Sequence, residues 1–552
     1  MSTSDTLQKS GKLTHNIALL FLIAAKAVTT SPPEWTSLPS GGWWERDGLV
    51  WVKSLAEHLE IPYEALPPQP TEEDIKPLGK MIPEVDHANI VLSILSLCLL
   101  PSANVSDTKA TKKAPPAPPL YYTASERAFL ARTLEFLDIP YTHLLNAEDY
   151  VAQGLYHELK SAEIDPKRAE AARKSKEQGR GGYWGRIAAT GVGIVLGGVA
   201  IGITGGLAAP AFLPLLPFLT AGSAPLVLGT LFGLTGGGLA GKRVNRRWAG
   251  VDKFEFTQIT GGGKVHDPGA VVHKKKVEMP GAQVETPQAP SLVATIIIPG
   301  ILLKSETEGI DSVEASSSIF TSPRRDTFVL SQSPGTMLAT GKALHSWVTS
   351  QLLGRLQGEI IKRTALQTLM GAVALPLTVY KTTGMVVDNE WIRGTDRARK
   401  AGRLLADVLK EKVQGERPVV LVGSSLGALA LFEAILTLST ANLPTPLIDT
   451  AIFISLPISP SPQEWSKVRS AVGRHVVNAY CATDLVLAVV GRLHEVLGEG
   501  RVTTMAGMGP VMAKENEKDL GVENVDLGEV IKGHFELNDK MGEILETVGA
   551  NV

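Results

Sequence analysis

The chain has 552 residues, of which 44% are hydrophobic, and a formal net charge of −2. This length exceeds one usual core and predicts two or three structural units. No basic excess, zinc-spaced Cys/His cluster or phosphate-binding glycine loop is present, so we expect no nucleic acid, metal or cofactor. The two cysteines, Cys98 and Cys481, lie far apart in apolar surroundings, which disfavours a disulfide-built secreted protein and favours a reducing compartment.

Residues 1–160 are predicted to form an α-helical N-terminal domain with proline-rich breaks between the helices. The apolar run 17–25 follows basic residues as in a signal peptide, but Lys26 interrupts it and no small-residue cleavage site follows. Thr123 and Glu126 have the spacing of a capping box and predict the start of a helix. Nothing here indicates chemistry, and we expect a role in packing or in binding a protein partner.

Residues 187–241 contain no charged residue and no histidine. Because one membrane-spanning helix needs about 20 residues, this length predicts a hairpin of two spans. Its prolines fall in the middle, where a turn is needed, and glycines recur every fourth residue in both halves, which permits close helix packing in lipid. The alternatives are a hairpin buried against the protein's own soluble domain and one that enters a single leaflet.

Basic residues flank this hairpin on both sides. Before it, residues 161–186 are predicted to form a basic juxtamembrane helix, and Lys242, Arg243, Arg246 and Arg247 follow it. Positive flanks stay on the cytosolic side of a membrane. We therefore expect an integral protein of an intracellular membrane with both termini and the C-terminal domain in the cytosol.

Residues 250–552 are predicted to form an α/β domain. Continuous apolar runs, typical of strands that are buried on both faces of a mostly parallel sheet, alternate here with helical patterns. The predicted strands are 294–298, 327–330, 419–422, 451–454 and 475–480.

A Gly-x-Ser-x-Gly motif, Gly423 to Gly427, lies between the strand 419–422 and a helix-forming stretch, 428–437. Strand, sharp turn and helix are the parts of the nucleophile elbow of an α/β-hydrolase, in which the central serine, here Ser425, is exposed. The motif alone is a weak signal, and this context carries the prediction.

A serine nucleophile needs a base, and that base needs an acid to orient it. In the α/β-hydrolase order both partners follow the serine, which leaves His475, His494 and His534. His475 opens a predicted strand and His494 lies in a predicted helix, whereas His534 lies in a loop before the last helix, so His534 is preferred as the base.

Asp484, just beyond the strand that ends at Tyr480, is the preferred acid, with Asp526 and Glu523 as rivals. The oxyanion of the reaction needs two backbone amides. The Leu426 amide follows the nucleophile directly, and the second is expected from the turn that contains Gly300, which makes Ile301 the candidate and Leu302 the alternative.

With these residues assembled, the chain resembles the transmembrane and coiled-coil domain-containing protein family, a eukaryotic group of membrane-associated proteins with an α/β-hydrolase domain. The resemblance covers roughly residues 120–545 and rests on the segments 205–210, 397–402, 405–407, 415–419, 425–428, 477–480 and 533–534, with Trp465, Val468 and Arg469. It implies Ser425, Asp484 and His534 as the triad. The chain departs from many relatives at Leu429, where they have arginine, and at Ile301, where they have tryptophan, and both departures bear on substrate preference.

Two functions are consistent with these features. The first is a membrane-associated serine esterase or lipase that acts on acyl esters through Ser425, Asp484 and His534. The second is a low-activity or inactive hydrolase-fold scaffold in vesicle traffic, which binds proteins through its N-terminal helices. The intact triad favours the enzyme, although fold alone does not decide between the two.

Overall fold

The protein is described by a computed structural model. The residues that it describes are 15–37, 42–100, 120–164, 231–232, 251–260, 264–266, 291–316, 326–356, 385–441, 443, 445–488, 490, 505–512 and 519–549.

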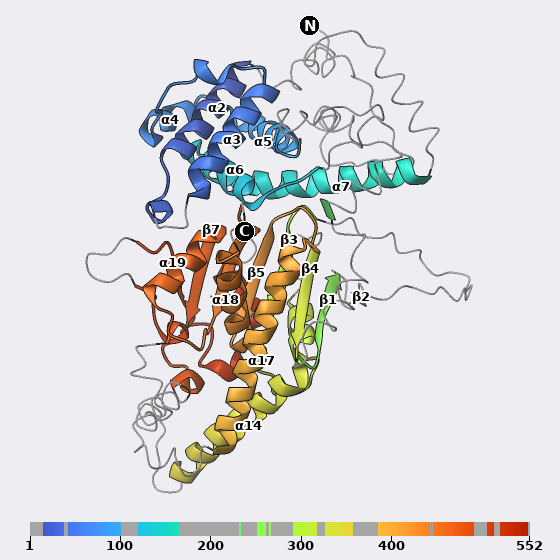
Figure 1. Ribbon diagram of the computed structural model, residues 1–552, viewed down its shortest axis with the longest axis vertical. Coiled ribbons are helices and arrows are strands. Elements are labelled where there is room, and N and C mark those ends of the chain that lie inside the picture. Colours follow the sequence, from blue (N-terminus) through green and yellow to red (C-terminus); the bar gives the residue numbers. More distant parts are fainter. Residues whose placement is uncertain are drawn as a thin grey trace.

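The centre of the molecule is a sheet of eight strands in the order β2-β1-β4-β3-β5-β6-β7-β8 (Figure 1). The strands are β1 (Phe254–Thr260), β2 (Lys264–His266), β3 (Ala294–Ile298), β4 (Asp326–Gln332), β5 (Val419–Ser424), β6 (Ile448–Ile454), β7 (Val472–Tyr480) and β8 (Glu523–Asp526). From β4 to β8 all neighbouring strands are parallel, whereas β1 pairs antiparallel with β4 and β2. The predicted α/β class and mostly parallel sheet are thus confirmed.

Apolar side chains cover both faces of the sheet. Along β5, Val419 and Leu421 belong to one hydrophobic cluster, while Val420 and Val422 belong to another. Successive residues of a strand point to opposite faces, so this division places a core on each side. The continuous apolar sequence of β5 follows from its burial on both faces.

Helices from the C-terminal region supply both covering layers. The first cluster contains residues of α14 (Pro334–Leu356), α17 (Met385–Lys410), α18 (Leu426–Ser439) and α19 (Pro462–Ser470). The second contains residues of α13 (Glu308–Ala315) and α21 (Met541–Thr547). Two of these helices, α14 and α17, extend beyond the edge of the sheet at which β5 ends (Figure 1).

The N-terminal helices form a further layer at the opposite edge, where the parallel strands begin (Figure 1). They are α2 (His15–Thr30), η1 (Glu34–Ser37), α3 (Trp43–His58), η2 (Tyr63–Ala65), α4 (Glu72–Gly79), α5 (Glu84–Cys98), α6 (Ala124–Phe136) and α7 (Thr142–Ile164). The predicted capping box of Thr123 and Glu126 is present at the start of α6.

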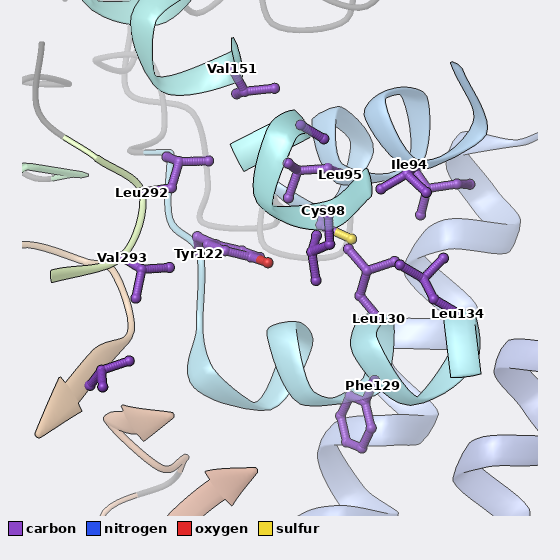
Figure 2. Close-up of a cluster of buried hydrophobic side chains, with 14 of the residues drawn as sticks. Ile94, Leu95, Cys98, Tyr122, Phe129, Leu130, Leu134, Val151, Leu292 and Val293 are labelled. Carbon is purple, nitrogen blue, oxygen red and sulfur yellow. The ribbon is translucent and has the colours of Figure 1, made fainter. Parts of the chain in front are cut away.

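This helical layer shares one hydrophobic cluster with the sheet. In Figure 2, Tyr122 lies between the helices and the segment of Leu292 and Val293 that leads into β3. The Tyr122 amide also donates to the carbonyl of Glu416, just before β5. The helices therefore pack as part of the same core as the sheet.

A buried ionic network joins the two parts. The guanidinium of Arg127, on α6, donates to Glu148 of α7 and to Asp449 of β6, each at 2.7 Å. Burial alone would raise the pKa of Asp449, but the guanidinium groups of Arg127 and Arg474 hold it below its ordinary value. A buried charge of this kind is tolerated only with its partners in place.

The predicted membrane hairpin, residues 187–241, lies outside the described residues except for Leu231 and Phe232. Both are buried, and the carbonyl of Phe232 accepts a hydrogen bond of 3.4 Å from Arg417. The predicted basic helix, 161–186, likewise lies outside them beyond Ile164. Of the helices that the structure describes, none combines the length and the apolar character needed to cross a membrane.

Candidate active site

The candidate site is built around a sharp turn at the end of β5. The strand leads directly into Ser425, and α18 begins at the next residue, Leu426. The backbone of Ser425 has φ 56° and ψ −126°, a conformation that costs an L-residue free energy and that the nucleophile elbow imposes on its serine. The Ser425 amide donates to the carbonyl of Ile454 at the end of β6, which holds the turn against its neighbour.

The two flanking glycines of the motif are required by close packing. A Cβ atom on Gly427 would lie 1.9 Å from the carbonyl oxygen of Ile298, and one on Gly423 would lie 2.7 Å from the Cα of Ala428. Both distances are far below van der Waals contact. Glycine at these positions lets α18 begin directly against the ends of β3 and β5.

The structure brings Ser425, His534 and Asp484 together from three separate segments. His534 Nε2 lies 2.6 Å from Ser425 Oγ, and His534 Nδ1 lies 2.7 Å from Asp484 Oδ2. The three residues are 1%, 3% and 0% exposed, respectively, so Ser425 is buried rather than exposed as the motif predicts. In such a buried setting each electrostatic interaction is stronger than it would be in water.

Local contacts hold the histidine and the carboxylate in this arrangement. The hydroxyl of Thr483 donates to the carbonyl of Lys532, and the thiol of Cys481 donates to that of Ile531, so the turn after β7 is tied to the loop that precedes His534. The second oxygen of Asp484 accepts the amide of Leu487 at 3.1 Å. One oxygen is therefore left for the imidazole.

The structure places the rival residues elsewhere. Asp526 accepts the amide of Gly528 at the end of β8, and Glu523 pairs with His475. His494 lies outside the described residues. Among the described carboxylates, Asp484 is the one that contacts His534.

The turn that follows β3 lies against the elbow. A Cβ atom on Gly300 would lie 2.5 Å from the Cβ of Ser425 and 2.6 Å from the amide nitrogen of Leu426. The Leu302 amide donates to the carbonyl of Met337 at 3.2 Å. Because this amide is already used, Ile301 rather than Leu302 is the remaining candidate beside Leu426.

Three polar side chains around this site have no signal in the sequence. Gln332 donates to the carbonyl of Leu426, and Asn538 donates to that of Ile301 and to Glu308. Each contact joins residues that are far apart in the chain.

Comparison with known proteins gives the family and its relatives. The family described as Protein of unknown function (DUF726) matches residues 183–551. The chain is 28% identical to the Transmembrane and coiled-coil domain-containing protein STS1 of Oryza sativa, over 85% of this chain and 67% of that protein. It is 27% identical to an uncharacterized membrane protein of Caenorhabditis elegans, over 91% of this chain and 72% of that protein.

A shorter similarity, 28% identity over 41% of this chain and 20% of the relative, links it to the Probable lipase MIL1 of Saccharomyces cerevisiae. No solved structure matches the chain significantly. The family match covers more than half of the chain, and the relatives carry the names that the sequence resemblance predicts. The relatives include a protein named as a transmembrane and coiled-coil domain-containing protein, and the chain itself belongs to the DUF726 family.

Proposed function

We propose that this protein is a serine hydrolase that cleaves acyl esters, with Ser425 as nucleophile, His534 as general base and Asp484 as the residue that orients the imidazole. The observation that carries the proposal is the continuous hydrogen-bonded series from Ser425 Oγ through His534 to Asp484 at a strained strand-to-helix turn. This arrangement supports nucleophilic catalysis by an alcohol.

In the proposed reaction the Ser425 oxygen attacks the ester carbonyl carbon while its proton passes to His534 Nε2. The amides of Leu426 and Ile301 would donate to the oxyanion that forms. His534 then gives its proton to the departing alcohol as the acyl carbon–oxygen bond breaks. Water, deprotonated by the same imidazole, releases the acid and restores the serine.

The relatives support a lipid-related substrate and a membrane setting. One of them is named a probable lipase, and two others are named as membrane or transmembrane proteins. We propose that residues 187–241 anchor the protein in an intracellular membrane as a hairpin, with both termini and the hydrolase domain in the cytosol; Leu231 and Phe232, which are buried in the protein's own core, lie outside the bilayer in this arrangement. Lipid or another acyl ester is the proposed substrate.

The test is labelling of the purified full chain with a fluorophosphonate probe. Attack by Ser425 Oγ forms a phosphorus–oxygen bond and expels fluoride, while the serine proton goes to His534. Labelling should be lost completely in Ser425→Ala and should fall by at least about 100-fold in His534→Ala. Asp484→Asn should slow it strongly.

Two control variants test whether the labelling depends on Ser425 and Asp484 in particular. Ser424→Ala changes the serine beside the nucleophile, and Asp526→Asn changes the rival acid; both should label at the natural rate. Equal labelling of Ser425→Ala and the natural chain would refute the nucleophile. Absence of labelling in the folded natural chain would favour the scaffold function instead.

A further inference from the structure

The segment that carries the histidine is tied by one side chain to the turn beside the elbow. Asn538 Nδ2 donates to the carbonyl of Ile301 at 3.2 Å and to Glu308 Oε1 at 2.9 Å. The Asn538 carbonyl in turn accepts a hydrogen bond from the hydroxyl of Ser312, on α13. The chain just after His534 is therefore bonded both to the turn and to the helix that follows it.

Glu308 extends this connection along the same turn. Its side chain is buried, and its second oxygen, Oε2, accepts the amides of Leu303 and Lys304, each at 2.6 Å. Bonds to an ionised acceptor are about twice as strong as bonds between neutral groups. Asn538 and Glu308 together thus hold the turn from Ile301 to Lys304.

The peptide between Ile301 and Leu302 is fixed at both ends. Its carbonyl accepts from Asn538, and its N–H donates to Met337. A peptide is a rigid plane, so bonds at both ends fix its orientation. The preceding amide, that of Ile301, follows Gly300, which lies against Ser425.

We propose that Asn538 is a positioning residue for the oxyanion site: it holds the peptide after Ile301 so that the Ile301 amide faces the reacting carbonyl. This inference rests on the proposed hydrolase function. Because Asn538 and His534 lie on one short segment, that segment fixes the position of the base relative to the oxyanion donor.

The first measurement is hydrogen–deuterium exchange of the segment 299–305, which does not depend on activity. In Asn538→Leu the amides of Leu302, Leu303 and Lys304 should exchange at least about 10-fold faster, since a contact that opens more often protects less. Asn538→Asp preserves size but cannot donate and places a second carboxylate beside Glu308, so it should have the same effect. Asp539→Asn, which removes an exposed ion pair with Lys304, is the matched control and should not change exchange.

The second measurement is the rate of fluorophosphonate labelling across pH. Both Asn538 variants should label about 10-fold more slowly at every pH, because they weaken one oxyanion donor. The midpoint of the pH–rate curve should stay that of the natural chain in Asn538→Leu, since this change adds no charge and His534 and Asp484 remain paired. A general loss of folding is recognised by a lowered melting temperature together with faster exchange throughout the chain.

The outcomes separate this inference from the proposed function. Faster exchange confined to the turn, with slower labelling and an unchanged midpoint, supports the positioning role. Unchanged exchange, unchanged labelling or a midpoint shifted in Asn538→Leu overturns it. If exchange rises as expected but the natural chain does not label, the proposed hydrolase function is refuted, while the structural link from Asn538 to the turn is supported.

Discussion

At the scale of single residues, the candidate site depends on the close approach of the Gly300 turn to Ser425. Gly300 brings the turn after β3 so near to Ser425 and Leu426 that no side-chain carbon fits between them. The same approach would let two backbone amides converge on one oxygen atom of a substrate. A glycine at this position therefore sets the geometry of the proposed oxyanion site as well as its packing.

Gly300→Ala should lower the rate of fluorophosphonate labelling by about 100-fold or more, since its Cβ would lie 2.4 Å from the carbonyl oxygen of Ser424 and would push the turn away. Overpacking should also destabilise the fold by about 1–3 kcal/mol. The matched control is Gly335→Ala, whose Cβ would meet only Glu306 Oε1 at 3.4 Å, and its labelling should be unchanged. A natural labelling rate in Gly300→Ala would contradict the assigned turn.

At the scale of elements, the start of α6 contains a carboxylate that titrates near neutral pH. Glu126 accepts the amide and the hydroxyl of Thr123, each at 2.8 Å, in the capping box. Burial raises the pKa of Glu126 to about 7, although the bonds from Thr123 oppose the shift. A folded pKa above the unfolded value of 4.5 means that protonation favours folding. This contribution is complete below pH 4.5 and is lost as the pH rises through 7.

Glu126→Gln should therefore remove part of the pH dependence of stability. Glutamine preserves the capping box, so the variant should match or exceed the natural chain above pH 7. Between pH 5 and 8 the free energy of unfolding of the natural chain should fall by about 1–2 kcal/mol relative to that of the variant. This is less than the full shift of the Glu126 pKa implies, because the side chain is only partly buried and solvent screens it. Denaturant unfolding at several pH values measures the difference, and parallel curves would exclude Glu126 as the source.

The elements and the site differ in how far the sequence predicts them. Apolar runs placed β3 and β5 correctly because a strand covered on both faces needs a continuous apolar sequence. Chain order and loop position selected Ser425, His534 and Asp484, which the fold brings together. The short polar strand β8 was not predicted, since three of its four residues are exposed and leave no apolar pattern. The contacts of Asn538 and Arg127 span distant segments, and no local pattern encodes them.

At the scale of the whole molecule, the N-terminal helices and the sheet form one structure. Trp43, on α3, donates to the carbonyl of Ser470 beside β7, and the guanidinium of Arg469 stacks on Trp35. The buried network of Arg127 crosses the same boundary. Removal of the helices would expose a large apolar surface and leave Asp449 without one of its cationic partners, so we expect the two parts to unfold together.

Arg127→Met should lower the free energy of unfolding by about 3–5 kcal/mol, because it leaves buried carboxylates without their cation. Arg399→Met removes an exposed arginine that pairs with Glu433 and should cost less than about 1 kcal/mol. In denaturant, the fluorescence of the N-terminal tryptophans and the labelling of Ser425 should disappear in one transition for every variant. Labelling that persists after the tryptophan signal is lost would show that the sheet folds without the helices.

The polarity of the parallel sheet also bears on where a substrate enters. Arg417, which contacts Phe232, lies just before the start of β5, whereas Ser425 follows the last residue of β5. The six residues of this strand, about 20 Å, separate Arg417 from Ser425. With the rest of the segment 187–241 in a bilayer, as proposed, the point at which this segment packs on the protein lies across the sheet from Ser425. An acyl ester would then approach from the cytosol or from an apposed membrane, rather than by lateral diffusion within the bilayer that anchors the protein.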